Sequence, residues 1–154
     1  MGISLGGRDP RPLGRGAPHN QPWRFLVVQD KQIKDGLGSF TKYAPVITAA
    51  PVVIAVCMDN AVSYNREKDI MAIGACIKNM LLQAHHMGMG ACWLGEIINR
   101  KEEVSRYLKL DTDLEVMAVI TLGPPAEKPG KGNRKGLKQL LIDMPAEGKR
   151  SQRE

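Results

Sequence analysis

Two side-chain amides beside a proline and a tryptophan mark the first segment that could do chemistry, Pro18-His19-Asn20-Gln21-Pro22-Trp23. An amide both donates and accepts hydrogen bonds, which suits the polar edge of a flat heterocycle. The apolar run Leu26-Val27-Val28 follows almost at once, so this segment stands at the start of an expected strand. A second interpretation stays open, because turn residues often cluster before a strand. Asn20 and Pro22 would then only form a turn, while Trp23 packs in the core.

The second segment is Met87-Gly88-Met89-Gly90-Ala91-Cys92-Trp93-Leu94-Gly95-Glu96, which directly follows an apolar helical pattern. A glycine at position 95 would let the backbone approach a ring without a Cβ in the way. Backbone N–H groups aimed at a redox-active ring can stabilise the charge that develops on it. The alternative is a helix C-cap at Gly88 with Trp93 buried behind it.

The third segment is a basic loop, Lys128-Pro129-Gly130-Lys131-Gly132-Asn133-Arg134-Lys135. A guanidinium fork matches the oxygens of a phosphate group, so this loop could hold a phosphate-bearing ligand. A basic run between glycines and prolines is equally typical of solvated surface.

In this order, the three segments resemble the nitroreductase family of flavin-dependent oxidoreductases, and the likeness extends from about residue 18 to residue 141. The resemblance implies that Asn20 and Gln21 meet the flavin ring and that the backbone of Gly95 and Glu96 faces its N5–O4 edge. The family usually keeps one residue between the Asn and the Gln, so either Asn20 reaches the ring through a tighter turn or His19 takes its place. The cofactor-binding residues implied in this way are His19, Asn20, Gln21, Trp23, Leu94, Gly95, Glu96, Lys131 and Arg134, the last two on the flavin phosphate.

The activity implied by the resemblance is FMN-dependent oxidoreduction. Hydride would pass from NADH or NADPH through flavin N5 to a nitroaromatic, a quinone or a similar small-molecule acceptor. The flavin supplies the chemistry, so neither a catalytic side chain nor a metal is expected. Family members are homodimers with the flavin at the subunit interface and chain ends that cross to the partner, so we expect an intertwined homodimer.

Nitroreductases normally begin with helices that carry an Arg-x-Ser-x-Arg-like phosphate motif, and residues 1–17 do not reproduce it. Arg8, Arg11 and Arg15 have a different spacing there, and two prolines disfavour a helix. We therefore expect this helical phosphate-binding segment to be missing and FMN to bind more weakly than in the family norm. A non-catalytic relative that binds flavin or another anion is the alternative function.

The elements that must position these segments can be read from hydrophobic periodicity. Strands are expected over 24–29, 50–58 and 114–122, and helices over 31–40, 67–86 and 100–110, the last capped by Asn99. This order predicts an α+β fold with a mixed or antiparallel sheet flanked by helices. The helix over 67–86 carries a wide apolar stripe, which favours burial between subunits or at the centre of the domain.

Composition limits the remaining choices. The length of 154 residues fits one domain, which we place at 18–143 between an irregular arm at 1–17 and a charged tail at 144–154. The apolar run 51–58 is far shorter than the roughly 20 residues of a membrane helix. Three widely spaced cysteines favour buried, reduced thiols and a cytoplasmic location. The net charge of +6 gathers near the chain ends, which leaves a basic nucleic-acid-binding module as a further alternative function. An aromatic content of 5% provides few side chains for base stacking and argues against it.

Overall fold

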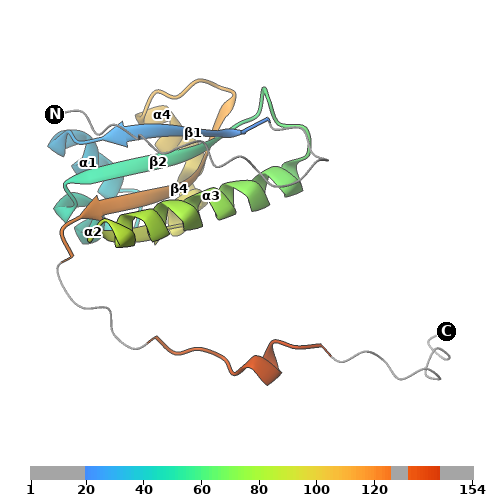
Figure 1. Cartoon of the computed structure of the whole chain (residues 1–154). Helices are drawn as coiled ribbons and strands as arrows, with labels where there is room; N and C mark the ends of the chain where they lie inside the picture. The colour runs from blue at the N-terminus through green and yellow to red at the C-terminus, as the bar shows by residue number, and fades with distance from the viewer. Residues whose placement is uncertain (1–19, 126–131, 143–154) are drawn as a thin grey trace.

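The computed structural model describes residues 20–125 and 132–142, and residues 20–125 are built around a four-stranded sheet (Figure 1). The strands are β1 (Trp23–Val28), β2 (Val52–Asp59), β3 (Gly90–Leu94) and β4 (Leu114–Gly123), in the spatial order β1-β2-β4-β3. Every pairing is antiparallel. The long apolar strands β2 and β4 therefore lie in the centre, and β1 and β3 form the two edges. The expected α+β fold is confirmed, with an antiparallel sheet.

Helices cover both faces of this sheet, and each face has its own apolar cluster. One cluster joins the central strands to α1 (Lys31–Gly38), α2 (Ala44–Ala49) and α4 (Lys101–Tyr107) through Leu37, Ile47 and Val104. The other joins them to α3 (Arg66–His86) through Ile73 and Ile77. Successive side chains of a strand point to opposite faces, so continuous apolar sequences in β2 and β4 supply both clusters.

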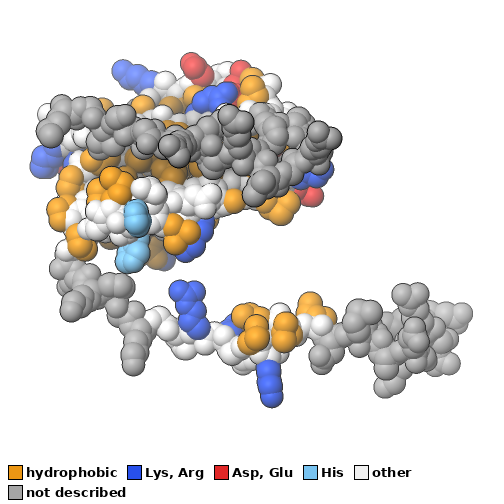
Figure 2. All heavy atoms as spheres, in the orientation of Figure 1, with side chains coloured by type: hydrophobic (Ala, Val, Ile, Leu, Met, Phe, Trp, Pro, Cys, Tyr) orange, Lys and Arg blue, Asp and Glu red, His pale blue; other side chains and the backbone are white. Residues whose placement is uncertain are grey.

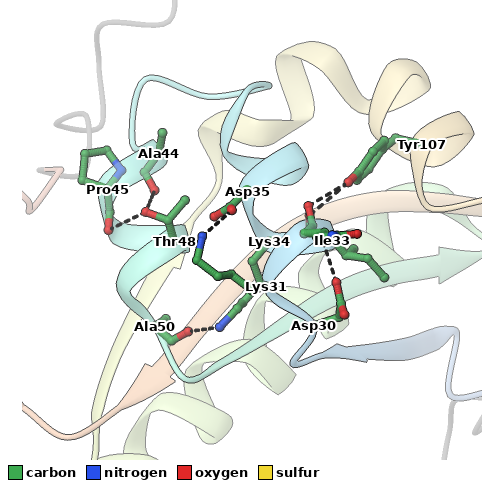
Figure 3. A network of polar contacts seen from close by, with 11 residues as sticks. Asp30, Lys31, Ile33, Lys34, Asp35, Ala44, Pro45, Thr48, Ala50 and Tyr107 are labelled. Carbon is green, nitrogen blue, oxygen red and sulfur yellow. Dashed lines mark hydrogen bonds and ion pairs between the residues drawn. The ribbon is translucent and has the colours of Figure 1, made fainter.

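The hairpin of α1 and α2 is fixed by polar contacts at its ends (Figure 3). Asp30 caps α1 by accepting a hydrogen bond from the Ile33 N–H at 3.0 Å. The buried Lys34 ammonium donates to the Ala50 carbonyl at 2.7 Å, where α2 has just ended. The Tyr107 hydroxyl of α4 donates to the Gln32 carbonyl at 3.2 Å. These contacts join the start of α1 to the end of α2 and to α4.

The long helix α3 confirms the helix expected over 67–86. It begins at the N-cap Asn65, whose side chain accepts from the Lys68 N–H at 3.0 Å. Its apolar stripe is wider than one sheet face can cover: Ile73, Ile77 and Ala84 are buried, whereas Ile70, Met71 and Leu82 are exposed.

An ion-pair cluster ties the first turns of α3 and α4 to the start of β4. Arg66 makes a two-point contact with Glu115, at 2.7 and 2.9 Å, and the Lys101 ammonium lies 2.5 Å from the same carboxylate. The hydrogen bond from Arg66, together with Lys101, outweighs partial burial and lowers the pKa of Glu115 to about 2. The cluster thus joins the helices on the two faces of the sheet.

The structure corrects the expected elements at three places. Residues 90–94 form the edge strand β3, which the sequence analysis did not expect; they pair with β4 from Gly90↔Gly123 to Leu94↔Val119. Residues 44–49 form α2, a helix that the sequence analysis missed. The helix expected over 100–110 is shorter, and its N-cap is Arg100, because Asn99 belongs to the preceding 3-10 helix η1 (Glu96–Arg100).

The described segment 132–142 leaves the sheet and extends away from it (Figure 1). It contains the 3-10 helix η2 (Leu137–Gln139), and Figure 2 shows its hydrophobic side chains apart from the main body. The expected arm and tail lie outside the described residues. No helix within 20–125 or 132–142 is long and apolar enough to cross a membrane.

Candidate functional site

The turn from β3 into η1 contains the two backbone N–H groups that the sequence analysis selected. Leu94 and Ile97 are buried on either side of this turn, whereas Gly95 and Glu96 are half-buried. Among the hydrogen bonds of the described residues, none is donated by the N–H of Gly95 or of Glu96. The sequence thus provides two adjacent backbone donors, held by apolar anchors, that are free for a ligand with an acceptor edge.

Gly95 itself has an ordinary backbone conformation, with φ of −78°. A Cβ added there would meet the indole Nε1 of Trp93 at 3.6 Å, an ordinary contact distance. Neither backbone strain nor a neighbour in this chain therefore requires glycine at position 95. Close approach of a ligand remains the predicted reason for it.

The loop between α1 and α2 lies against the same turn, a contact that the sequence analysis missed. The Thr41 hydroxyl donates to Glu96 Oε2 at 2.5 Å, and Arg100 Nη1 donates to the Ser39 carbonyl at 3.0 Å. These bonds join residues that are 55 and 61 positions apart in the sequence. No local pattern marks such pairs, so only the fold reveals them. The loop 39–43 thereby becomes part of the candidate site.

Asn20 is anchored at the opposite edge of the sheet, near the first turn of α3. Its Nδ2 donates to the Val62 carbonyl at 2.9 Å and to Asp69 Oδ1 at 3.3 Å. Because both partners only accept, they fix the orientation of the amide and leave its Oδ1 as the free group. Asn20 can therefore offer a ligand an acceptor but not a donor.

The buried carboxylate of Asp69 accepts several hydrogen bonds beside Asn20. It accepts from the Ser63 hydroxyl at 2.7 Å and from the backbone N–H groups of Tyr64 and Asn65 at 3.2 and 3.4 Å, besides Asn20. Burial acts to raise the pKa of Asp69, but the hydrogen bonds together outweigh it and lower that pKa below its ordinary value. The carboxylate stays ionised and holds the loop before α3 against Asn20.

The remaining residues of the first segment have mixed surroundings. Gln21 is exposed and has a left-handed φ of 43°, and its carbonyl accepts from Arg24 Nη1 at 2.9 Å. Pro22 is buried, and the half-buried Trp23 packs against the apolar cluster beneath α3. Trp23 therefore contributes to the core, and a role on the flavin remains a prediction.

The first and second segments do not meet within one copy of the chain. The first leads into edge strand β1 and the second ends edge strand β3, with β2 and β4 between them. Three interstrand spacings separate the two edges, roughly 14 Å in total. One copy therefore cannot bring Asn20 and Gly95 to the same edge of a single flat ring.

The basic loop is described only in part. Arg134 is exposed and belongs to the segment 132–142, which lies apart from the sheet (Figure 1). Lys131 and His19, the other predicted ligands from the chain ends, lie outside the described residues.

A groove of about 1110 Å³ lies at the other end of β3, between α2, the end of α3 and the end of β4. It is lined by Leu81, His85 and Cys92 among others, and does not include Gly95 or Glu96. Cys92 is exposed, which corrects the expectation that all three thiols are buried. Cys57 is buried, and burial raises the pKa of its thiol to about 11; Cys76 is partly buried.

Comparison with known proteins identifies the family of the chain. The family model described as "Nitroreductase family" matches residues 39–124, more than half of the chain. The chain belongs to the nitroreductase family. The matched range of this nitroreductase-family chain includes the loop 39–43 and the Gly95–Glu96 turn.

Solved structures agree with this assignment. A candidate nitroreductase from Desulfovibrio desulfuricans, whose crystal structure contains FMN, is 42% identical, with a TM-score of 0.77 over 82% of this chain and 74% of that one. A candidate NADH oxidase from Clostridium acetobutylicum is 28% identical, with a TM-score of 0.71 over 81% of this chain and 77% of that one.

A curated relative from Methanothermobacter thermautotrophicus is described as a candidate NADH dehydrogenase/NAD(P)H nitroreductase. It is 31% identical over 124 residues, which are 79% of this chain and 65% of the relative. The chain thus spans just under two thirds of the length of this relative.

Proposed function

We propose that this nitroreductase-family chain is an FMN-dependent oxidoreductase that uses NADH or NADPH to reduce a small organic acceptor. The main support for this function is the Gly95–Glu96 turn, which has two free N–H donors between the buried Leu94 and Ile97. The D. desulfuricans relative binds FMN, which supports the same cofactor here.

The residues of the turn fit the polar edge of a flavin. When bound, FMN accepts hydride at N5 and passes it to the acceptor. The Gly95 and Glu96 N–H groups would point at the N5–O4 edge and stabilise charge there, since fixed backbone dipoles need no reorganisation. Arg134 and Lys131 would hold the phosphate. Nitroaromatics and quinones are the acceptor classes we propose.

We further propose that the site is completed by a second copy of the chain. Asn20 and Gly95 lie at opposite sheet edges, so a flavin near both must lie between two copies. The apolar side chains that α3 leaves exposed, together with the 45% exposed Trp93, provide a surface for such contact. The extended segment 132–142 carries further exposed apolar side chains that a partner would bury: Leu137, Leu140, Leu141 and Ile142.

Three measurements on the full chain test this function. FMN-loaded protein should oxidise NADH or NADPH when a nitroaromatic or quinone is added, and light scattering should give the mass of a dimer. Tight FMN binding without oxidation of either nucleotide would favour the non-catalytic alternative. A strictly monomeric FMN-bound protein would refute the shared site but not the activity.

A further inference from the structure

The contact between Thr41 and Glu96 links the candidate flavin edge to the loop 39–43, which joins α1 to α2. Both residues are half-buried, and the Thr41 Oγ1 to Glu96 Oε2 distance is 2.5 Å. Glu96 is the first residue of η1, directly after Gly95. The side chain that Thr41 holds therefore belongs to one of the two residues whose N–H groups are free.

The direction of this hydrogen bond follows from the groups involved. An ionised carboxylate only accepts, so the single hydroxyl hydrogen of Thr41 must be the donor. The oxygen of the same hydroxyl accepts from the Tyr43 N–H at 3.2 Å, which orients it. Among the described residues Glu96 takes part in no ion pair. The Thr41 hydroxyl is therefore the polar group that the structure places against the Glu96 carboxylate.

The η1 turn is attached to the loop 39–43 at both of its ends. Its first residue, Glu96, accepts a hydrogen bond from Thr41, and its last residue, Arg100, donates one to the Ser39 carbonyl. Between them Ile97 is fully buried. Buried Ile97 fixes the position of the turn, whereas the Thr41 bond fixes the side chain of Glu96.

We propose that Thr41 is a positioning residue of the flavin site, which holds the Glu96 carboxylate so that the adjacent N–H groups face the ring and its negative charge is partly compensated. This inference rests on the proposed function. A negative charge close to a flavin disfavours electron uptake, and it acts more strongly in a partly buried site than in water. Loss of the Thr41 hydroxyl should therefore make the bound flavin harder to reduce, whereas neutralising Glu96 should make it easier.

The test compares four variants of the FMN-loaded full chain. Thr41→Val removes the hydroxyl with little change of shape, and Thr41→Ser keeps it. Glu96→Gln removes the charge. Thr48→Val is the matched control, because Thr48 is also half-buried in the same hairpin but its hydroxyl bonds only within α2, to Ala44 and Pro45 carbonyls at 3.1 and 3.5 Å. The readouts are the midpoint potential of bound FMN, kcat and KM for NADH, and the urea midpoint.

We expect a more negative potential in Thr41→Val, a more positive one in Glu96→Gln, and values like the wild type in Thr41→Ser and Thr48→Val. The kcat of Thr41→Val should fall roughly tenfold with a smaller change in KM, as expected for one lost hydrogen bond to a charged group. A merely structural contact would lower the urea midpoint without shifts of opposite sign. Unchanged potential and kcat in Thr41→Val would overturn the inference alone, whereas wild-type protein that binds no FMN would overturn the proposed function with it.

Discussion

Replacing Gly95 by proline removes one N–H donor from the candidate flavin edge without a conformational conflict. The φ of −78° at Gly95 lies within the range that proline adopts, and the preceding Leu94 is in a strand, as the residue before a proline prefers. The new Cβ would meet Trp93 Nε1 at 3.6 Å. Since this N–H bonds nothing among the described residues, the free energy of unfolding should change by less than about 1 kcal/mol.

The effect on the flavin should be much larger than the effect on the fold. A hydrogen bond to a charged group contributes about 1.5–3 kcal/mol, and about 1.4 kcal/mol is a factor of ten. FMN affinity and the rate of its reduction by NADH should together fall by roughly ten- to a hundredfold. Gly95→Ala separates the two roles of position 95, because alanine adds the same Cβ but keeps the N–H. The loss that alanine reproduces reflects space for the ring, and the additional loss in Gly95→Pro reflects the donor.

Urea unfolding, fluorescence titration with FMN and stopped-flow reduction measure the three quantities separately. A Gly95→Pro protein that folds normally and keeps the affinity and reduction rate of the wild type would refute the assignment of this N–H to the flavin. An equal loss in Gly95→Ala would show that space for the ring, and not the donor, is what position 95 provides.

Three further predictions concern the scaffold. Glu115→Gln should cost about 1–2 kcal/mol of unfolding free energy at pH 7, after allowance for solvent screening of its cationic partners. The pKa of Glu115 is lowered from 4.5 to about 2, so this contribution is fully present above pH 4.5 and is lost as pH falls towards 2; a urea series across that window checks it, and a pH-independent difference would contradict it. Ile97→Ala should lower the free energy of unfolding by about 2–5 kcal/mol and weaken FMN binding, whereas Ile97→Val should cost only about 0.5–1.5 kcal/mol. Iodoacetamide should label the exposed Cys92 long before the buried Cys57, whose thiol pKa of about 11 keeps it protonated, as peptide mass spectrometry would reveal.

The sequence was sufficient for the parts of the fold that rest on strong periodicity. The apolar runs of β2 and β4 and the stripe of α3 depend on local pattern and burial, and all three elements lie close to the expected residues. The strand β3 was missed because its five residues show no alternation: an edge strand owes its structure to the partner β4. The helix α2 was missed because six residues are too short for a helical period to be visible.

The candidate site was predictable only where its residues are adjacent in sequence. Gly95 and Glu96 were found from a string of ten residues, whereas Thr41 needed the fold, since it lies 55 positions from Glu96. The position of Asn20 could not be foreseen either, because its partner Asp69 looks like an ordinary first-turn carboxylate of α3. Sequence order also concealed that the two segments proposed to bind flavin belong to opposite edges of the sheet.

The central claim is that this chain binds FMN as a redox cofactor, and the visible spectrum of the purified full chain tests it most directly. The spectrum should show bound flavin, either as purified or after FMN is added and the excess removed, and anaerobic NADH or NADPH should bleach it. Protein that stays colourless after incubation with FMN would contradict the claim.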